Sequence, residues 1–162
     1  MPRTVSRDPK IELRSKASKA HAVMTIGYQE RTVIDFIRAL RAAKVTTLVD
    51  IRAVPMSRRA EFRKNALASL LDDAGIRYVG IPRLGTPKEL RERLKADGNY
   101  VAFFRDFRAQ MIYQRAALRQ LLDLSSGERV ALLCFERDAD QCHRSVVAAY
   151  VSGKLNCDVI DL

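Results

Sequence analysis

Hydrophobic and polar positions alternate between two patterns along the chain. Segments of strand length lie at residues 22–26, 46–52, 77–81, 130–135 and 157–162. The first, second and fourth are continuous apolar or β-branched runs, which are typical of strands covered on both faces. Apolar residues at helical spacing fill the segments between them, at residues 32–43, 65–74, 86–96, 100–122 and 141–151. The alternation predicts parallel strands that are joined by helical crossovers.

This order predicts an α/β fold. We expect a single-domain, Rossmann-like three-layer sandwich with a mainly parallel sheet of about five strands, formed by residues 22–162. The chain has no G-x-G-x-x-G motif after its first strand and no G-x-x-x-x-G-K-[ST] motif. The sequence therefore supports neither a dinucleotide-binding fold in the strict sense nor a P-loop nucleotide hydrolase.

Residues 1–21 differ from the rest of the chain. They carry a net charge of +4 out of the total of +10, which leaves +6 for the predicted α/β domain. A basic, serine-containing start of this kind is typical of a phosphate-tracking arm or of an organellar transit peptide. We favour a basic N-terminal arm that packs on its own domain or on a neighbouring subunit, and in the second case the protein could oligomerise through it.

Composition restricts the class of protein and its partners. The 162 residues are 48% hydrophobic and 30% charged, without an apolar stretch long enough to span a membrane or to serve as a signal peptide. Three cysteines, an odd number, favour a reducing, cytoplasmic location over a disulfide framework. The sequence pI of about 9.9 favours polyanionic partners, namely a nucleotide, a phosphorylated ligand or nucleic acid, and no membrane partner is expected.

Candidate site residues gather where the predicted strands end, because the carboxyl ends of parallel strands meet at one edge of a sheet. We expect a pocket there that is lined by Gly27, Tyr28, Pro55, Gly85 and Cys134. The candidate anion-binding side chains are Arg52, Arg58, Arg59, Arg144 and Ser145. The strand ends therefore predict a basic rim around a small number of carboxylates and thiols.

The junction between the fourth predicted strand and the last predicted helix carries the candidate catalytic groups. Cys142 lies near a helix start, where the helix dipole and free amides should lower the pKa of its thiol. Cys142 would then be a nucleophile beside His143, with Asp50 or Glu136 as the general acid or base. The alternative is that Cys142 and His143 pack and cap the turn, while Arg144 pairs with Asp50 or Glu136.

The same junction leaves two further alternatives open. Cys134, Cys142 and His143 could supply three ligands to a catalytic zinc ion that keeps an open position. The usual C-x-x-C spacing is missing, and Cys157 should lie at the opposite sheet edge. The favoured assignment therefore includes no metal and no cofactor. A disulfide switch between Cys134 and Cys142 is the other alternative.

The densest basic segment covers residues 52–64. Phe62 could stack on a nucleic-acid base among these cations, or it could pack against the helix that follows. A second group of cations in the helix at residues 86–96 carries less weight, because Glu89 and Glu92 offset it.

Four motifs in this chain resemble a prokaryotic family known only as domain of unknown function number 488, which is distantly related to YeaO-like proteins. The motifs are Thr25-Ile26-Gly27-Tyr28, then Leu48-Val49-Asp50-Ile51-Arg52-Ala53-Val54-Pro55 with Ser57-Arg58, then Gly75-Ile76-Arg77-Tyr78 with Leu84-Gly85, and finally Cys134-x-Glu136 with Cys142-His143-Arg144. The resemblance covers roughly residues 24–162. It implies a parallel α/β fold with a site at the strand ends, and it brings no established reaction. Tyr28 stands where some relatives carry a histidine.

Three functional hypotheses remain after these steps. The first is a cytosolic α/β protein that binds a nucleotide or a nucleic-acid phosphate at the sheet edge, with room for cysteine-dependent chemistry. The second is a non-catalytic nucleic-acid or protein interaction module with a structural Cys-His-Arg turn. The third is a thiol enzyme that acts on a small anionic metabolite. The sequence leaves open whether the protein is an enzyme.

Overall fold

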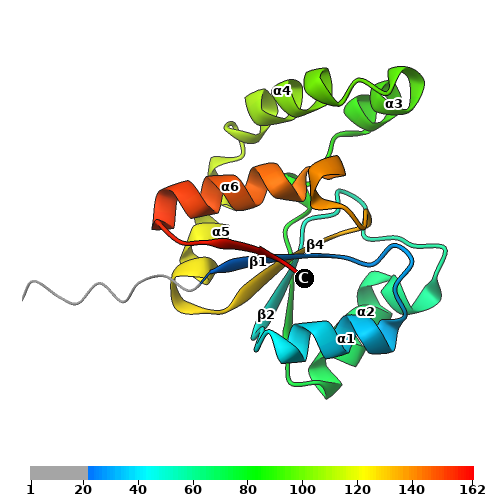
Figure 1. The fold of residues 1–162 in the computed structure, drawn as a ribbon, viewed down its shortest axis with the longest axis vertical. Helices are drawn as coiled ribbons and strands as arrows, with labels where there is room; N and C mark the ends of the chain where they lie inside the picture. Colours follow the sequence, from blue (N-terminus) through cyan, green and yellow to red (C-terminus); the bar gives the residue numbers. More distant parts are fainter. Residues whose placement is uncertain (1–21) are drawn as a thin grey trace, which may run out of the picture.

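A five-stranded parallel sheet forms the centre of the computed structural model, which describes residues 22–162 (Figure 1). The strands are β1 (Val23–Gly27), β2 (Thr47–Asp50), β3 (Arg77–Gly80), β4 (Val130–Cys134) and β5 (Val159–Asp161), arranged in the order β3-β2-β4-β1-β5. Every neighbouring pair is parallel. The predicted α/β fold with a parallel sheet is therefore confirmed.

The register brings the carboxyl ends of the strands level. Gly27 at the end of β1 pairs with Cys134 at the end of β4, and Asp50 at the end of β2 pairs with Gly80 and lies level with Leu133. The strand ends that carry the candidate site residues thus share one edge of the sheet, as the sequence predicts.

Helices cover both faces of the sheet (Figure 1). One face carries α1 (Val33–Ala42) and α2 (Lys64–Asp73), and the other side holds α3 (Lys88–Asp97), α4 (Tyr100–Met111), α5 (Arg115–Gly127) and α6 (Arg144–Leu155). Short 3₁₀ turns occupy Ala60–Phe62, Pro82–Leu84 and Ala139–Gln141. The α3–α4 pair extends away from the sheet beyond α6.

The helical stretch over residues 100–122 is divided into α4 and α5 at residues 112–114, close to the step near Tyr113 where the sequence pattern allows a break. The start of the last helix differs from the sequence prediction. The last helix begins at Arg144, because a 3₁₀ turn takes the three residues from Ala139 to Gln141. Cys142 therefore precedes α6 and does not lie in its first turn.

Two apolar cores hold the layers together. Phe36, Leu40 and Leu67 are fully buried between the sheet and α1 and α2, and Leu121 and Val147 are buried on the other face beneath α5 and α6. Burying one such side chain stabilises the fold by about 1.5–3 kcal/mol relative to leaving it in water. The cores make the sheet a rigid support for the loops at its carboxyl edge.

The predicted basic arm at residues 1–21 lies outside the described residues. Within residues 22–162, no helix is both long and apolar enough to cross a lipid bilayer.

Candidate functional site

A cavity of about 830 Å³ opens at the carboxyl edge of the sheet. Its walls come from the loops after β1, β2 and β4 and from the α3–α4 pair. The lining residues are Tyr28, Arg52, Ala53, Val54, Met56, Ser57, Arg58, Arg59, Thr86, Arg91, Leu94, Lys95, Tyr100, Phe103, Cys134, Phe135, Glu136, Gln141 and His143. Its size and its place at the strand ends are typical of ligand sites in parallel α/β proteins.

The cavity includes half of the residues expected from the sequence. The predicted residues that line it are Tyr28, Arg52, Arg58, Arg59, Cys134, Glu136 and His143. The predicted residues that lie around it without lining it are Gly27, Asp50, Pro55, Gly85, Cys142, Arg144 and Ser145. Several of the residues that do not line the cavity hold the lining residues in place through hydrogen bonds or close backbone contacts.

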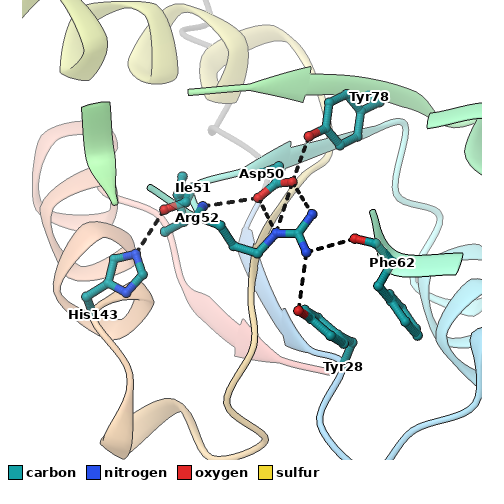
Figure 2. Close-up of polar contacts among 7 residues, drawn as sticks. All are labelled: Tyr28, Asp50, Ile51, Arg52, Phe62, Tyr78 and His143. Carbon is teal, nitrogen blue, oxygen red and sulfur yellow. Dashed lines mark hydrogen bonds and ion pairs between the residues drawn. The ribbon is translucent and has the colours of Figure 1, made fainter. Parts of the chain in front are cut away.

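Asp50 and Arg52 form a buried ion pair at the end of β2 (Figure 2). The Asp50 side chain is 1% exposed, and its carboxylate accepts hydrogen bonds from Arg52 Nε at 2.9 Å and from Arg52 Nη2 at 2.6 Å. It also accepts a bond from the Tyr78 hydroxyl at 2.6 Å. Burial and this bond together raise the pKa of Tyr78 well above its usual range. The Asp50 carboxylate is thus fully engaged by protein groups.

The Arg52 guanidinium is occupied on its other side as well. Its Nη1 donates to the Phe62 carbonyl at 2.8 Å and to the Tyr28 hydroxyl at 3.3 Å (Figure 2). Burial alone would lower the pKa of Arg52, but the bonds and charge of Asp50 raise it above its usual value. Arg52 therefore joins the strand end to the loop that carries Arg58 and Arg59.

Phe62 lies inside the protein and cannot reach a ligand. Its ring is fully buried and stacks on Tyr28, with ring centroids 4.4 Å apart. It also meets Phe36 edge-to-face at 5.3 Å. The hypothesis that Phe62 stacks on a base is wrong, and the alternative that it packs beside α2 is confirmed.

Arg144 clamps the loop after β4 onto β1. The side chain is 2% exposed, and its Nε donates to Thr25 Oγ1 at 3.2 Å. Its two terminal nitrogens donate to the carbonyl oxygens of Glu136 and Arg137. These bonds occupy the guanidinium and hold Glu136 at the rim of the cavity. The expected pairing of Arg144 with the Asp50 or Glu136 carboxylate is wrong, because its acceptors are a hydroxyl and two backbone carbonyls.

Arg59 and Ser145 also have protein partners. Arg59 pairs with Glu61 at 2.8 Å and donates to the carbonyl oxygens of Tyr28 and Arg31. Ser145 Oγ donates to the Cys142 carbonyl at 2.9 Å, which closes the turn before α6. Both residues stabilise the loops around the cavity.

Gly27 and Gly85 allow loops to pass closer than any side chain would permit. A Cβ on Gly27 would lie 1.8 Å from the Glu136 carbonyl oxygen, and a Cβ on Gly85 would lie 2.1 Å from the backbone nitrogen of Ala53. Each contact is impossible without a backbone shift. The two glycines thus bring the β4 loop against β1, and the loop after β3 against the loop after β2.

Cys134, Cys142 and His143 form a buried cluster below the cavity. His143 Nε2 contacts the Ile51 carbonyl at 3.1 Å (Figure 2), while its Nδ1 lies 3.6 Å from Cys134 Sγ and 3.8 Å from Cys142 Sγ. Burial acts to lower the pKa of His143, but its hydrogen bonds with Cys142 and Ile51 and the nearby charge of Glu136 together raise it.

The expected activation of Cys142 by a helix start is wrong. Its side chain is 1% exposed, and burial together with the neighbouring Cys134 raises the pKa of the thiol far above its ordinary value. At Glu136, burial acts to raise the pKa, but the hydrogen bonds from Cys134, its own backbone and Cys142, and the nearby His143, outweigh burial and lower it. A free Cys142 thiol is therefore protonated at neutral pH, and Glu136 is ionised.

The α3–α4 pair supplies cavity residues that the sequence pattern did not identify. Arg91 and Lys95 of α3 face the cavity, as do Tyr100 and Phe103 of α4. Arg91 and Lys95 are one helical turn apart, so a single face of α3 presents both cations. This spacing is visible in the sequence, but which face of α3 meets the cavity depends on how the pair folds over the sheet.

A protein-family model identifies the family of this chain. The family model described as domain of unknown function DUF488 matches residues 32–151. The chain belongs to this family. The matched range holds Asp50, Arg52 and the Cys-His-Arg motif, while the Thr25–Tyr28 motif precedes it. Comparison with curated proteins gives no significant match.

Proposed function

We propose that the cavity binds a phosphate-bearing ligand, either a nucleotide or a strand of nucleic acid. The observation that carries this proposal is the set of cations without partners along its walls. Arg58, Arg91 and Lys95 are exposed, and none of them forms a side-chain hydrogen bond or ion pair with another residue of the described range 22–162. Unpaired cations that converge on a cavity favour an anionic ligand.

The charge of the cavity is one-sided. Five of its lining residues are arginine or lysine, and Glu136 is the single carboxylate among them in the described chain. Arg52 and Arg59 are neutralised by Asp50 and Glu61, so the excess positive charge comes from the three unpaired cations. A phosphate group would replace the water that solvates them, with charge-assisted hydrogen bonds.

Exposed aromatic and apolar side chains stand beside these cations. Phe135 is 46% exposed, and Tyr100 is 39% exposed. The Tyr28 ring packs edge-to-face against the Phe135 ring, with ring centroids 5.3 Å apart. An aromatic face next to unpaired cations suits a base stacked beside its phosphate, which favours nucleotides over simple phosphorylated metabolites.

The predicted site residues take different parts in this proposal. Arg58, Arg91 and Lys95 would contact phosphate, and Glu136 would accept a hydrogen bond from a sugar hydroxyl or a base amino group. Arg52 and Arg144, which the sequence suggested as anion ligands, would position the loops through their protein partners. A catalytic role for Cys142 or Asp50 is not part of the proposal, because burial and hydrogen bonding occupy both.

Fluorescence polarisation with labelled nucleotides and labelled single-stranded oligonucleotides tests the proposal. We expect binding at low salt, and about a tenfold or greater loss of affinity for Lys95→Glu and for Arg91→Glu, since each removes a charge-assisted contact. Arg41→Glu is the matched control, because Arg41 is an exposed arginine near the end of α1, away from the cavity. Absence of binding, or an equal loss in the control, would contradict the proposal.

The same assay separates the two kinds of ligand. The exposed apolar rim at Val54 and Met56 continues the cavity wall outward, which favours a longer strand over a single nucleotide. We expect affinity to rise with oligonucleotide length, and Phe135→Ala to weaken oligonucleotide binding while it leaves binding of inorganic phosphate unchanged. Equal affinity for a mononucleotide and a long strand would identify a nucleotide site.

A further inference from the structure

Two thiols and one imidazole nitrogen face a common point beneath the cavity. The ligand atoms of Cys134, Cys142 and His143 all lie within 4.8 Å of one another, and all three side chains are buried. We propose that these residues bind a zinc ion whose fourth coordination position faces the cavity. This proposal goes beyond phosphate binding and does not depend on it.

The distances fit tetrahedral zinc. With Zn–S of about 2.3 Å and Zn–N of about 2.0–2.1 Å, neighbouring ligand atoms lie about 3.5–3.8 Å apart. His143 Nδ1 lies 3.6 Å from Cys134 Sγ and 3.8 Å from Cys142 Sγ. The two sulfur atoms lie within 4.8 Å of each other. Binding a zinc ion therefore requires them to approach each other by up to about 1 Å.

The tautomer of His143 suits a metal ligand. The Ile51 carbonyl can only accept a hydrogen bond, so its contact at 3.1 Å requires the proton on Nε2. The lone pair of Nδ1 then points at the two thiols. Histidines that bind metals almost always donate their other N–H to a carbonyl or a carboxylate in this way, which fixes the ring.

The surroundings of Cys142 favour a metal-bound thiolate, whereas the Cys134 thiol, which donates to the Glu136 carboxylate at 3.0 Å, would have to release that proton when it binds the metal. The Arg144 backbone N–H lies 3.5 Å from Cys142 Sγ, as a donor to a sulfur ligand would. Two thiolates neutralise the charge of one zinc ion, so the occupied site carries no net charge in its buried position. The ion itself deprotonates a coordinating thiol, which overcomes the effect of burial.

The fourth position opens toward the cavity, because Cys134 and His143 line it while Cys142 lies beneath. Glu136 stands beside that position, with its Oε2 3.0 Å from Cys134 Sγ. Three protein ligands and an open position are characteristic of catalytic zinc, whereas structural zinc has four protein ligands. A zinc-bound water here would have a carboxylate beside it to accept its proton.

Elemental analysis of the full chain, purified without a histidine tag, tests the proposal. We expect about one zinc per chain as purified, or after zinc is added to protein that has been stripped with a chelator. Cobalt(II) should replace zinc and give thiolate charge-transfer bands with the intense visible bands of tetrahedral cobalt. A chain that takes up neither metal would overturn the proposal.

Cysteine variants identify the ligands. Cys134→Ser and Cys142→Ser should each abolish stoichiometric zinc and the cobalt charge-transfer bands. Cys157→Ser is the matched control, because Cys157 is also a buried cysteine but lies outside the cluster. Equal metal loss in the control would overturn the assignment, and so would a Cys134–Cys142 disulfide in protein purified under reducing conditions. If a variant fails to fold, the cobalt spectrum of the wild-type protein still shows whether thiolates bind the metal.

Discussion

Replacing Arg52 by methionine removes one partner of the buried ion pair while it keeps most of the side-chain volume. The Asp50 carboxylate, 1% exposed, would lose its bonds from Nε and Nη2 of Arg52. It would keep the Tyr78 hydroxyl at 2.6 Å and the backbone N–H of residue 52 at 3.1 Å. The Phe62 carbonyl and the Tyr28 hydroxyl would lose a donor.

Breaking a buried pair in this way typically costs about 3–5 kcal/mol, and the two remaining donors place this variant near the lower end. Because a domain of this kind is stable by about 5–15 kcal/mol, Arg52→Met should lose a large share of that free energy of unfolding. Urea denaturation followed by circular dichroism measures the loss. An m-value equal to that of the wild type would show that the compactness of the folded and unfolded states is unchanged.

The double variant Asp50→Leu/Arg52→Met separates the charge effect from packing. Removing both charges leaves no buried ion without a partner, so the double variant should be more stable than Arg52→Met alone. Two results would refute the role given to this pair. One is a loss in the free energy of unfolding below about 1 kcal/mol for Arg52→Met, and the other is a loss in the double variant equal to the sum of the losses in Arg52→Met and Asp50→Leu.

Two further predictions follow from the glycines and the buried thiol. Gly85→Ala should destabilise the fold by about 1–3 kcal/mol, because its Cβ would lie 2.1 Å from the Ala53 nitrogen. Gly153→Ala should stabilise the fold by about 0.5–1 kcal/mol, because Gly153 lies inside a helix and an added Cβ would meet nothing within 4 Å. Urea denaturation measures both changes in the free energy of unfolding, and changes of the same sign would contradict this account. In metal-free native protein near neutral pH, iodoacetamide should label Cys142 far more slowly than in urea, because burial raises the pKa of its thiol. Fast native labelling, followed by peptide mass spectrometry with Cys157 as the reference, would contradict the burial argument.

The centre of the sheet was predictable because β1 and β4 are short, continuous apolar runs. Val130–Cys134 and Val23–Gly27 are buried at every position, and their sequences have no helical period. The helix starts were harder to predict. The sequence suggests a helix from residue 141, but a 3₁₀ turn over Ala139–Gln141 moves the start of α6 to Arg144. Cys142 therefore lies ahead of the helix, and burial of its side chain raises the pKa of the thiol, where the sequence predicts that the pKa falls.

The place of the cavity was predictable from topology, and the hydrogen-bond partners of the residues around it were not. Parallel strands must bring Tyr28, Arg52, Cys134 and Glu136 to one edge. A sequence does not show which arginines are already paired: Arg144 is held by the Thr25 hydroxyl of β1 and by the backbone carbonyls of Glu136 and Arg137. Lys95 has no ion-pair partner among the described residues, although the glutamates of α3 suggested from the sequence that the cations of this helix are offset.

The salt dependence of oligonucleotide affinity tests most directly whether the cations of the cavity contact phosphate. For single strands, the slope of log K against log salt changes by about 0.7 for each phosphate contact. The triple variant Arg58→Gln/Arg91→Gln/Lys95→Gln should therefore have a slope about 2 units shallower than the wild type, while Arg41→Gln keeps the wild-type slope. Equal slopes for the triple variant and the wild type would contradict the assignment of this cavity as the phosphate site.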